Sequence, residues 1–143
     1  MSGDGNLRPL FREYLPMFHW QSVETAITGG GVPDSNYCLA GCEGWVEFKQ
    51  TKAWSVHVKP AQVGWIERRI RTGGNVFVAV RQTCEGNRRR PRCDDLWIFS
   101  GEYIRDLKVG GLTAAASNAL LHTCGGPTHW DWIKVRQSLL QTS

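Results

Sequence analysis

The stretch from Gly31 to Lys49 constrains the fold of this chain more than any other, and it reads GVPDSNYCLAGCEGWVEFK. Successive side chains of a β-strand point to opposite faces of the sheet. Glu47 and Lys49 are two residues apart, so in a strand they share one face. Val46 and Phe48 share the other face. This alternation predicts a strand with one apolar face and one face that carries charged groups.

A second acidic residue stands just before this strand. Pro33 disfavours helix in the residue before it and suits a turn, so we expect Asp34 to open a preceding strand over residues 35–40. The short link GCEG then joins the two strands in a hairpin. A hairpin of this kind brings Asp34 and Glu47 towards the same edge of the sheet.

Two carboxylates that approach each other in this way call for a positive charge between them. At about 4 Å they repel by roughly 4 kcal/mol when the effective dielectric constant is about 20. Their hard oxygen atoms suit Mg²⁺, for which Mn²⁺ can substitute, better than a thiolate-seeking metal. Lys49 on the same face could hold a water or neutralise charge on a phosphate. We therefore expect a site for phosphodiester hydrolysis; the alternative is a turn residue beside an exposed strand face.

A known family has the same pattern of PD, a spacer of about a dozen residues, and then E, any residue, K. The matching residues are Pro33, Asp34, Glu47 and Lys49. They resemble the core motif of the PD-(D/E)XK nuclease superfamily, in the setting helix, strand, turn, strand, strand. The segment KPAQVGWIERR further resembles the helix that follows this motif in small stand-alone VRR-Nuc and phage Holliday-junction-resolvase-like nucleases. The resemblance covers about residues 6–81.

The resemblance implies a Mg²⁺-dependent endodeoxyribonuclease. In such an enzyme, Asp34, Glu47 and the backbone carbonyl of Phe48 would bind the metal. Lys49 would orient the attacking water or stabilise charge on the phosphate. Gln62, in the first turn of the following helix, would touch the water or complete the metal shell.

The family usually carries a further glutamate on its first helix. Here the only counterpart on that helix is Glu13, which matches the pattern poorly. We expect Glu24, at the end of the first strand, to supply the extra carboxylate or to position a metal-bound water. A strand-end residue that faces solvent is the alternative. The three glycines that follow, Gly29 to Gly31, suit a close approach of a DNA strand or a flexible hinge.

Basic residues gather in two segments, although the net charge of the chain is only +4. Clustered arginines typically contact phosphates, which raises affinity for nucleic acid without reading its sequence. A solubilising surface is the alternative, and His57 could instead act as a general base. The side chains that we expect to contact DNA are Lys52, His57, Lys59, Arg68, Arg69, Arg88, Arg89 and Arg90.

The resemblance also bears on the substrate and the assembly. Small one-domain members often act on branched DNA as homodimers, because two sites then face two symmetric strands. We therefore expect a Holliday-junction-resolvase-like enzyme, which a phage could encode. A restriction-type or repair endonuclease and a non-catalytic DNA-binding protein on a nuclease scaffold remain the alternatives.

The length of 143 residues suits one domain. We expect residues 1–143 to form a single α/β domain with a mixed central sheet of about five strands and helices on both sides, and residues 1–5 to be disordered. Residues 110–127 could be helical or could form a loop over the core. Trp130, Ile133 and Leu140 are the expected core contacts of the last helix. The expected helices cover residues 7–15, 60–72, 101–107 and 129–140; the expected strands cover 18–25, 35–40, the stretch around 46–49, 75–81 and 95–100, with a polar loop over 82–94.

The 5 cysteines are scattered and odd in number, which argues against a secreted disulfide framework. A zinc site from Cys84, Cys93, His122 and Cys124 is conceivable, but no CxxC pair supports it, so reduced thiols are the default. The sequence has no signal peptide and no apolar segment of spanning length. We therefore expect a soluble, cytoplasmic protein that does not bind a membrane, in the host cytoplasm if a phage encodes it.

Overall fold

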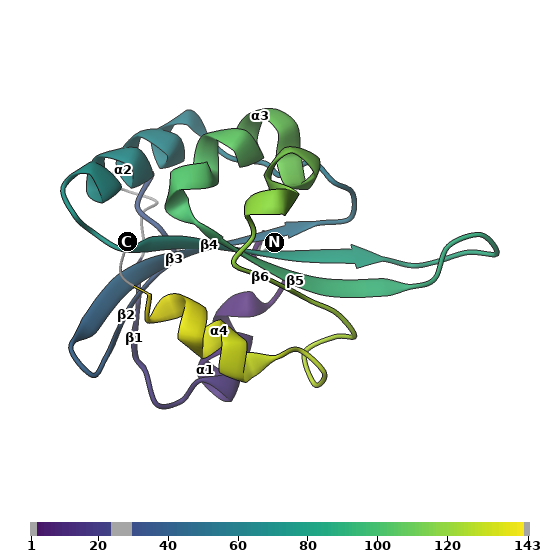
Figure 1. Cartoon of the computed structure of the whole chain (residues 1–143), viewed down its shortest axis with the longest axis horizontal. Coiled ribbons are helices and arrows are strands. Elements are labelled where there is room, and N and C mark those ends of the chain that lie inside the picture. The colour runs from purple at the N-terminus through teal and green to yellow at the C-terminus, as the bar shows by residue number, and fades with distance from the viewer. Residues whose placement is uncertain (1–2, 24–29, 142–143) are drawn as a thin grey trace.

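One mixed sheet with helices on both faces forms the molecule (Figure 1). The structure is a computed structural model, and it describes residues 3–23 and 30–141. Within these residues the sheet has 6 strands in the order β1-β2-β3-β4-β5-β6. This architecture confirms the expected α/β class, with one strand more than expected. The strands are β1 (His19–Ser22), β2 (Ser35–Leu39), β3 (Cys42–Thr51), β4 (Val76–Cys84), β5 (Cys93–Ser100) and β6 (Leu121–Thr123); the helices are α1 (Leu7–Tyr14), α2 (Pro60–Arg71), α3 (Ile104–Ala115) and α4 (Trp132–Leu139), with short 3-10 turns at Gly101–Tyr103 and Ala116–Asn118.

The first strands form an antiparallel meander, β1 to β2 to β3. The turn between β2 and β3 consists of Ala40 and Gly41, which have φ angles of 51° and 81°. A two-residue loop with both angles positive is a type I′ turn, whose twist matches that of the flanking strands. The expected GCEG link is therefore wrong in detail, because Cys42 already belongs to β3 and pairs with Leu39.

The connection from β3 through α2 to β4 joins two parallel strands. Helix α2 starts at Pro60, as expected, because proline at the first helical position loses no hydrogen bond. Val63 and Ile66 lie one turn apart and are both buried beneath it. The helix thus covers the face of the sheet to which Glu47 points.

Each face of the sheet has its own core. On the face covered by α1 and α4, Phe11 packs edge-on against Phe48 with ring centroids 4.9 Å apart. On the face covered by α2 and α3, Val78 and Val80 of β4 pack among the helical side chains. Figure 1 shows the two helix pairs on opposite sides. The alternation predicted for β3 is confirmed, because Val46 and Phe48 belong to the first core.

Several expected segments differ from the structure. The N-terminal residues 3–5 form a turn, and its Asp4 is buried rather than disordered. The loop expected over residues 82–94 is shorter, because β4 runs to Cys84 and β5 begins at Cys93. Gln82 shows why the ladder continues: this polar residue is buried in β4, where its Oε1 accepts a hydrogen bond from Trp97 at 3.1 Å.

The C-terminal third contains more structure than the sequence suggested. Helix α3 extends to Ala115, and residues 121–123 form the sixth strand, β6. In α4, Ile133 is 65% exposed, so its expected core contact is wrong. Val135 and Leu139 occupy the inner face instead, since residues four apart share one side of a helix. Trp130 is buried as expected, and Leu140 packs partly buried against the same core.

Candidate active site

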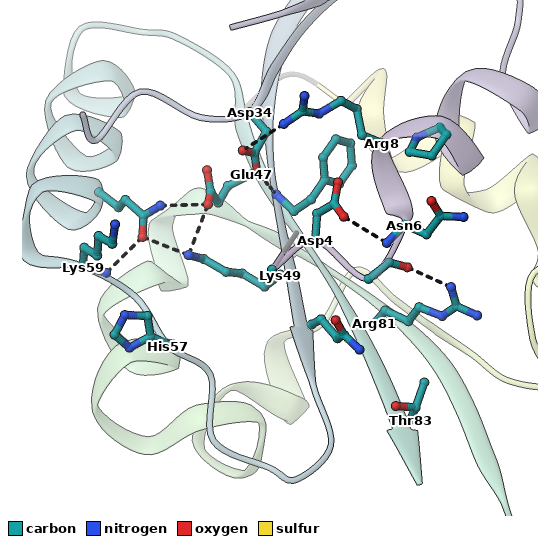
Figure 2. Close-up of a pocket in the computed structure, with 16 residues that line it drawn as sticks. Asp4, Asn6, Arg8, Asp34, Glu47, Lys49, His57, Lys59, Arg81 and Thr83 are labelled. Carbon is teal, nitrogen blue, oxygen red and sulfur yellow. Dashed lines mark hydrogen bonds and ion pairs between the residues drawn. The ribbon is translucent and has the colours of Figure 1, made fainter. Parts of the chain in front are cut away.

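A pocket of about 1100 Å³ lies where α1, β3 and α2 meet. It is referred to here as the main pocket. Figure 2 shows that its acidic and basic side chains come from segments far apart in the sequence. The polar residues that line it are Asp4, Asn6, Arg8, Asp34, Glu47, Lys49, Gln50, His57, Lys59, Gln62, Arg81 and Thr83. Asp34, Glu47, Lys49 and Gln62, which the sequence singled out, are therefore brought together.

Glu47, Lys49 and Gln62 form one connected group. The Lys49 ammonium lies 3.2 Å from Glu47 Oε2, which confirms that the two side chains share a face of β3. Gln62 Nε2 donates to the same carboxylate oxygen at 2.8 Å. Gln62 Oε1 accepts from Lys49 Nζ at 2.9 Å. The glutamine thus fixes both charged groups relative to each other, since it bonds to each of them.

The position of Gln62 is itself fixed by the start of α2. Its Oε1 also accepts from the backbone N–H of Lys59 at 2.9 Å, just before the helix. A side chain in the third helical position that reaches back to the residue before the helix is one half of a capping box. The same amide therefore caps the start of the helix and supports the site.

Asp34 reaches the pocket from the residue before β2. Its Oδ2 accepts from the backbone N–H of Phe48 at 2.9 Å, so it is fastened across to β3 beside Glu47. Arg8 of α1 lies 3.7 Å from the other oxygen. The Phe48 side chain is buried in the opposite core, which leaves its backbone to contribute to the pocket.

Both carboxylates hold their protons more tightly than usual. Burial and, to a smaller extent, the nearby charge of Asp34 together raise the pKa of Glu47 to about 7, against the opposing effect of Lys49. Burial also raises the pKa of Asp34, although the hydrogen bond from Phe48 and the charge of Arg8 oppose this. Loss of water around the buried carboxylates is therefore the main cause of both shifts, because burial disfavours the charged form.

Two functional candidates in this pocket were not anticipated. Asp4 is 8% exposed, and its charge raises the pKa of Asp34. The Asn6 backbone N–H donates to Asp4 Oδ1 at 2.9 Å, an Asx-type turn before α1. The sequence Asp-Gly-Asn directly before a helix is the signal that could have indicated this turn. Arg8, the second candidate, lies in the first turn of α1 on the side that faces the pocket (Figure 2).

Arg81 of β4 holds the N-terminal turn in place. Its Nη1 donates to the carbonyl of Gly5 at 2.8 Å. Its other nitrogens donate to both oxygens of Asp94 on β5, at 2.9 and 2.8 Å. A bidentate pair of this kind fixes the orientation of the guanidinium group. Asp4 is thereby anchored beside the two acids of the motif.

The outcome for the two remaining acidic candidates differs. Glu13 is exposed and does not line it, so it does not supply the extra carboxylate. Glu24 lies outside the residues that the structure describes, as does Gly29. Gly31 packs against the first turn of α2, where a side chain would collide with the Ala61 carbonyl. A glycine at this position is therefore required for its packing against α2.

Six of the eight side chains that were expected to contact DNA divide into three groups. His57 and Lys59 line the main pocket from the segment before α2. Lys52 and Arg90 line a second depression, next to the β4–β5 hairpin. Arg88 and Arg89 are exposed in that hairpin.

Arg68 and Arg69 point elsewhere. Both are exposed on α2, and neither lines the main pocket. The Arg69 guanidinium lies 4.7 Å from the ring centre of Trp65 and 5.6 Å from that of Trp45. This stacking assigns Arg69 a packing role at the far end of the helix.

The donor set of the main pocket fits a hard divalent cation. Asp34 and Glu47 offer carboxylate oxygens side by side, and burial, with a smaller effect of a neighbouring acid, raises the pKa of both. Asp4 adds a third carboxylate at the same pocket. Oxygen donors in this number suit Mg²⁺ or Mn²⁺. Asp34, Glu47 and the Phe48 carbonyl are the groups that would hold it.

Among the residues that the structure describes, no helix is long and apolar enough to cross a membrane. No model of a known protein family matches this chain, and no curated protein has a significantly similar sequence. What the main pocket does is therefore inferred from its own geometry and charge.

Proposed function

We propose that this protein is a Mg²⁺-dependent endonuclease that hydrolyses phosphodiester bonds of DNA. The observation that carries the proposal is the convergence of Asp34, Glu47, Lys49 and Gln62 on one pocket, where hydrogen bonds connect the last three. The order α1, β1, β2, β3 also agrees with the order of elements in the nuclease superfamily that the motif resembles.

The side chains of the pocket have distinct tasks in this proposal. Bound Mg²⁺ would supply a water of lowered pKa and stabilise the charge of the scissile phosphate. Lys49, held by Glu47 and Gln62, orients the attacking water or stabilises the charge that develops on the phosphate. Arg8 and Lys59 add positive charge at the same pocket for the flanking phosphates.

DNA is the proposed partner because basic side chains extend beyond the pocket. Arg88, Arg89 and Arg90 are exposed in the hairpin between β4 and β5, which projects from the body of the molecule (Figure 1). An arm of this kind can follow a phosphate backbone without reading bases. We further propose branched DNA, such as a four-way junction, as the substrate and a homodimer as the active species. Such an enzyme acts in the cytoplasm, or in the host cytoplasm if a phage encodes it.

The direct test is cleavage by the Asp34→Ala variant. With Mg²⁺ present, the wild type should cut a synthetic four-way junction faster than a linear duplex of the same sequence or a plasmid. The variant should lose cleavage while it keeps its circular dichroism spectrum, because removing one charge relieves repulsion in the pocket. Glu102→Ala, at an exposed acid outside the pocket, is the matched control and should cut normally.

Two results would contradict the proposal. Normal cleavage by Asp34→Ala would remove the assigned site. Wild-type protein that binds DNA but neither cuts it nor takes up Mg²⁺ in a calorimetric titration would instead be a non-catalytic binding protein. Preference for the plasmid over the junction would keep the nuclease and replace the branched substrate with a restriction-type one.

A further inference from the structure

Three potential metal ligands lie together on the opposite side of the sheet from the β1 edge. They are Asp95 of β5, His122 of β6 and Cys124, which directly follows β6. One ligand atom from each lies within 4.8 Å of the others. None of the three lines the main pocket.

The strand register explains why these residues meet. Trp97 of β5 pairs with His122 of β6 in an antiparallel ladder. Continuing that register by two residues places Cys124 opposite Asp95. Side chains of directly opposed residues lie on the same face, so all four form one patch. The spacing of two within each strand is what brings the sulfur, nitrogen and oxygen atoms together.

The distances are close to those of a tetrahedral zinc centre. With Zn–N near 2.0–2.1 Å and Zn–S near 2.3 Å, tetrahedral angles require about 3.6 Å between nitrogen and sulfur and about 3.3 Å between nitrogen and oxygen. Cys124 Sγ lies 3.7 Å from His122 Nε2, which already satisfies the first requirement. Asp95 Oδ2 lies 2.7 Å from the same nitrogen, so the carboxylate would have to move away by about 0.6 Å to reach the distance set by the zinc bond lengths.

The histidine is held in place by its neighbours. Its ring stacks on Trp97, with ring centres 3.6 Å apart and planes 9° from parallel. Trp97 is itself buried and donates its indole N–H to Gln82 at 3.1 Å. A ligand whose ring plane is fixed loses little freedom when it binds a metal. The His122 side chain is 37% exposed, which leaves a path for an ion to enter.

We propose that Asp95, His122 and Cys124 bind one Zn²⁺ ion, with water as the fourth ligand. A thiolate, an imidazole and a carboxylate together suit this borderline ion, whereas the all-oxygen set of the main pocket suits a hard cation. The ion fastens the three-residue strand β6 to β5 and thereby closes one edge of the sheet. The site is independent of the chemistry proposed for the main pocket.

This ligand set differs from the one considered in the sequence. Cys84 and Cys93 are free thiols that lie opposite each other in the register at the end of the β4–β5 ladder. They do not belong to the group of His122 and Cys124, in which Asp95 takes their place. An aspartate within a strand carries no spacing signal for zinc, so only the register reveals it.

The test is a titration of the full chain with Co²⁺, which gives visible spectra at zinc sites. One equivalent should produce a thiolate-to-cobalt charge-transfer band, and one equivalent of Zn²⁺ should abolish it. Cys124→Ser should lose the band, whereas Cys38→Ser, at a half-buried cysteine of β2, should keep it. The pocket variant Asp34→Ala should also keep it, so this result does not depend on the nuclease proposal.

Stability provides a second measurement. Zn²⁺ should raise the Tm of the wild type and of His129→Gln, because a ligand that binds only the folded state stabilises it. His122→Gln should show no such rise and should bind Zn²⁺ at least about tenfold more weakly. No charge-transfer band in the wild type, or a band that survives in Cys124→Ser, would overturn the proposal. If Cys124→Ser fails to fold, a normal Zn²⁺ affinity of His122→Gln would overturn it as well.

Discussion

Strands β3 and β4 are parallel neighbours, yet they use the same face of the sheet in opposite ways. Glu47 lies beside Val78 in the register, and Lys49 lies beside Val80. Both valines are fully buried, and Glu47 is only 3% exposed. The core under α2 thus has an apolar strand next to one that places a carboxylate at a buried position and an ammonium group at a half-buried one.

The comparison identifies β3 as the strand in which charged groups of the main pocket lower the stability of the fold. Burying a carboxylate is costly unless hydrogen bonds and opposite charges compensate for the lost water. Gln62 and Lys49 supply part of that compensation, and the raised pKa of Glu47 shows that the rest is missing. Strand β4 stabilises the core, whereas β3 holds the reactive groups at the expense of stability.

The largest effect is expected when the buried charge of β3 is removed, which makes this strand more like its apolar neighbour β4. Glu47→Gln removes a charge but keeps the shape and a hydrogen-bonding group. Mg²⁺-dependent cleavage should fall at least about a thousandfold, or roughly 4 kcal/mol of transition-state stabilisation. Urea unfolding should show no loss of stability at pH 8, because the variant buries no unbalanced carboxylate. Cleavage within tenfold of the wild-type rate would show that the two strands do not differ in this way.

The next effect is a pH dependence of the metal-free protein. Since the pKa of Glu47 rises from 4.5 in its ordinary state to about 7 in the fold, the folded protein binds the extra proton between these values. Its contribution to stability is fully present below pH 4.5 and is lost as the pH rises through about 7. Since each unit of pKa difference corresponds to about 1.4 kcal/mol, the loss of unfolding free energy approaches about 3.5 kcal/mol.

Urea unfolding from pH 4.5 to 8 measures this loss. Asp34 contributes in the same direction, because its pKa is also raised. The fall in unfolding free energy should be much smaller in Glu47→Gln, which does not titrate at that position. An equal fall in both proteins would place its cause outside β3.

A smaller effect is expected from the apolar strand. Val80→Ala removes two methyl groups from a fully buried position of β4. At about 0.8 kcal/mol per buried carbon, with a further term for the cavity, unfolding should become easier by about 2 kcal/mol. The metal-dependent cleavage rate below the unfolding temperature should stay within about twofold, and a larger loss would mean that the valine shapes the site.

The smallest effect concerns the hairpin that extends β4. Replacing Arg88, Arg89 and Arg90 together by alanine should slow cleavage less than about tenfold at low salt, and it should make the dependence of DNA affinity on salt shallower by up to about 3 in log–log slope. The matched control replaces Lys108, Lys134 and Arg136 by alanine, and these substitutions remove the same charge from α3 and α4. An equal change of slope in both triple variants would assign the effect to net charge rather than to the hairpin.

Local signals predicted the centre of the fold well. The alternation around Glu47 predicted the two faces of β3, and proline at residue 60 predicted the start of α2. Both features depend on neighbouring residues alone. Strand β6 could not be found in this way, because three residues carry no period and their pairing with β5 joins positions far apart in sequence. The predicted core contact of Ile133 was wrong for a related reason, since composition does not reveal which side of a short helix faces the core.

The motif residues of the pocket were predictable because their spacing within one hairpin fixes their positions. Asp4 was not, because its place depends on Arg81, which lies far along the chain and holds the carbonyl of Gly5. Arg8 was missed for a different reason: nothing in the helical pattern of α1 distinguishes a surface arginine from one that faces a pocket. Long-range contacts that complete a site have no local signature.

The anchoring of the N-terminal turn by Arg81 also sets an order of events during synthesis. Ribosomes add about 5–20 residues per second, so Asp4 leaves the ribosome well before strand β4, which carries Arg81, and strand β5, which carries its partner Asp94. The full set of pocket carboxylates can therefore assemble only after most of the polypeptide has been translated. A nascent chain would be unable to act on nucleic acid until β5 has emerged, which ties the onset of any activity to near-completion of the protein.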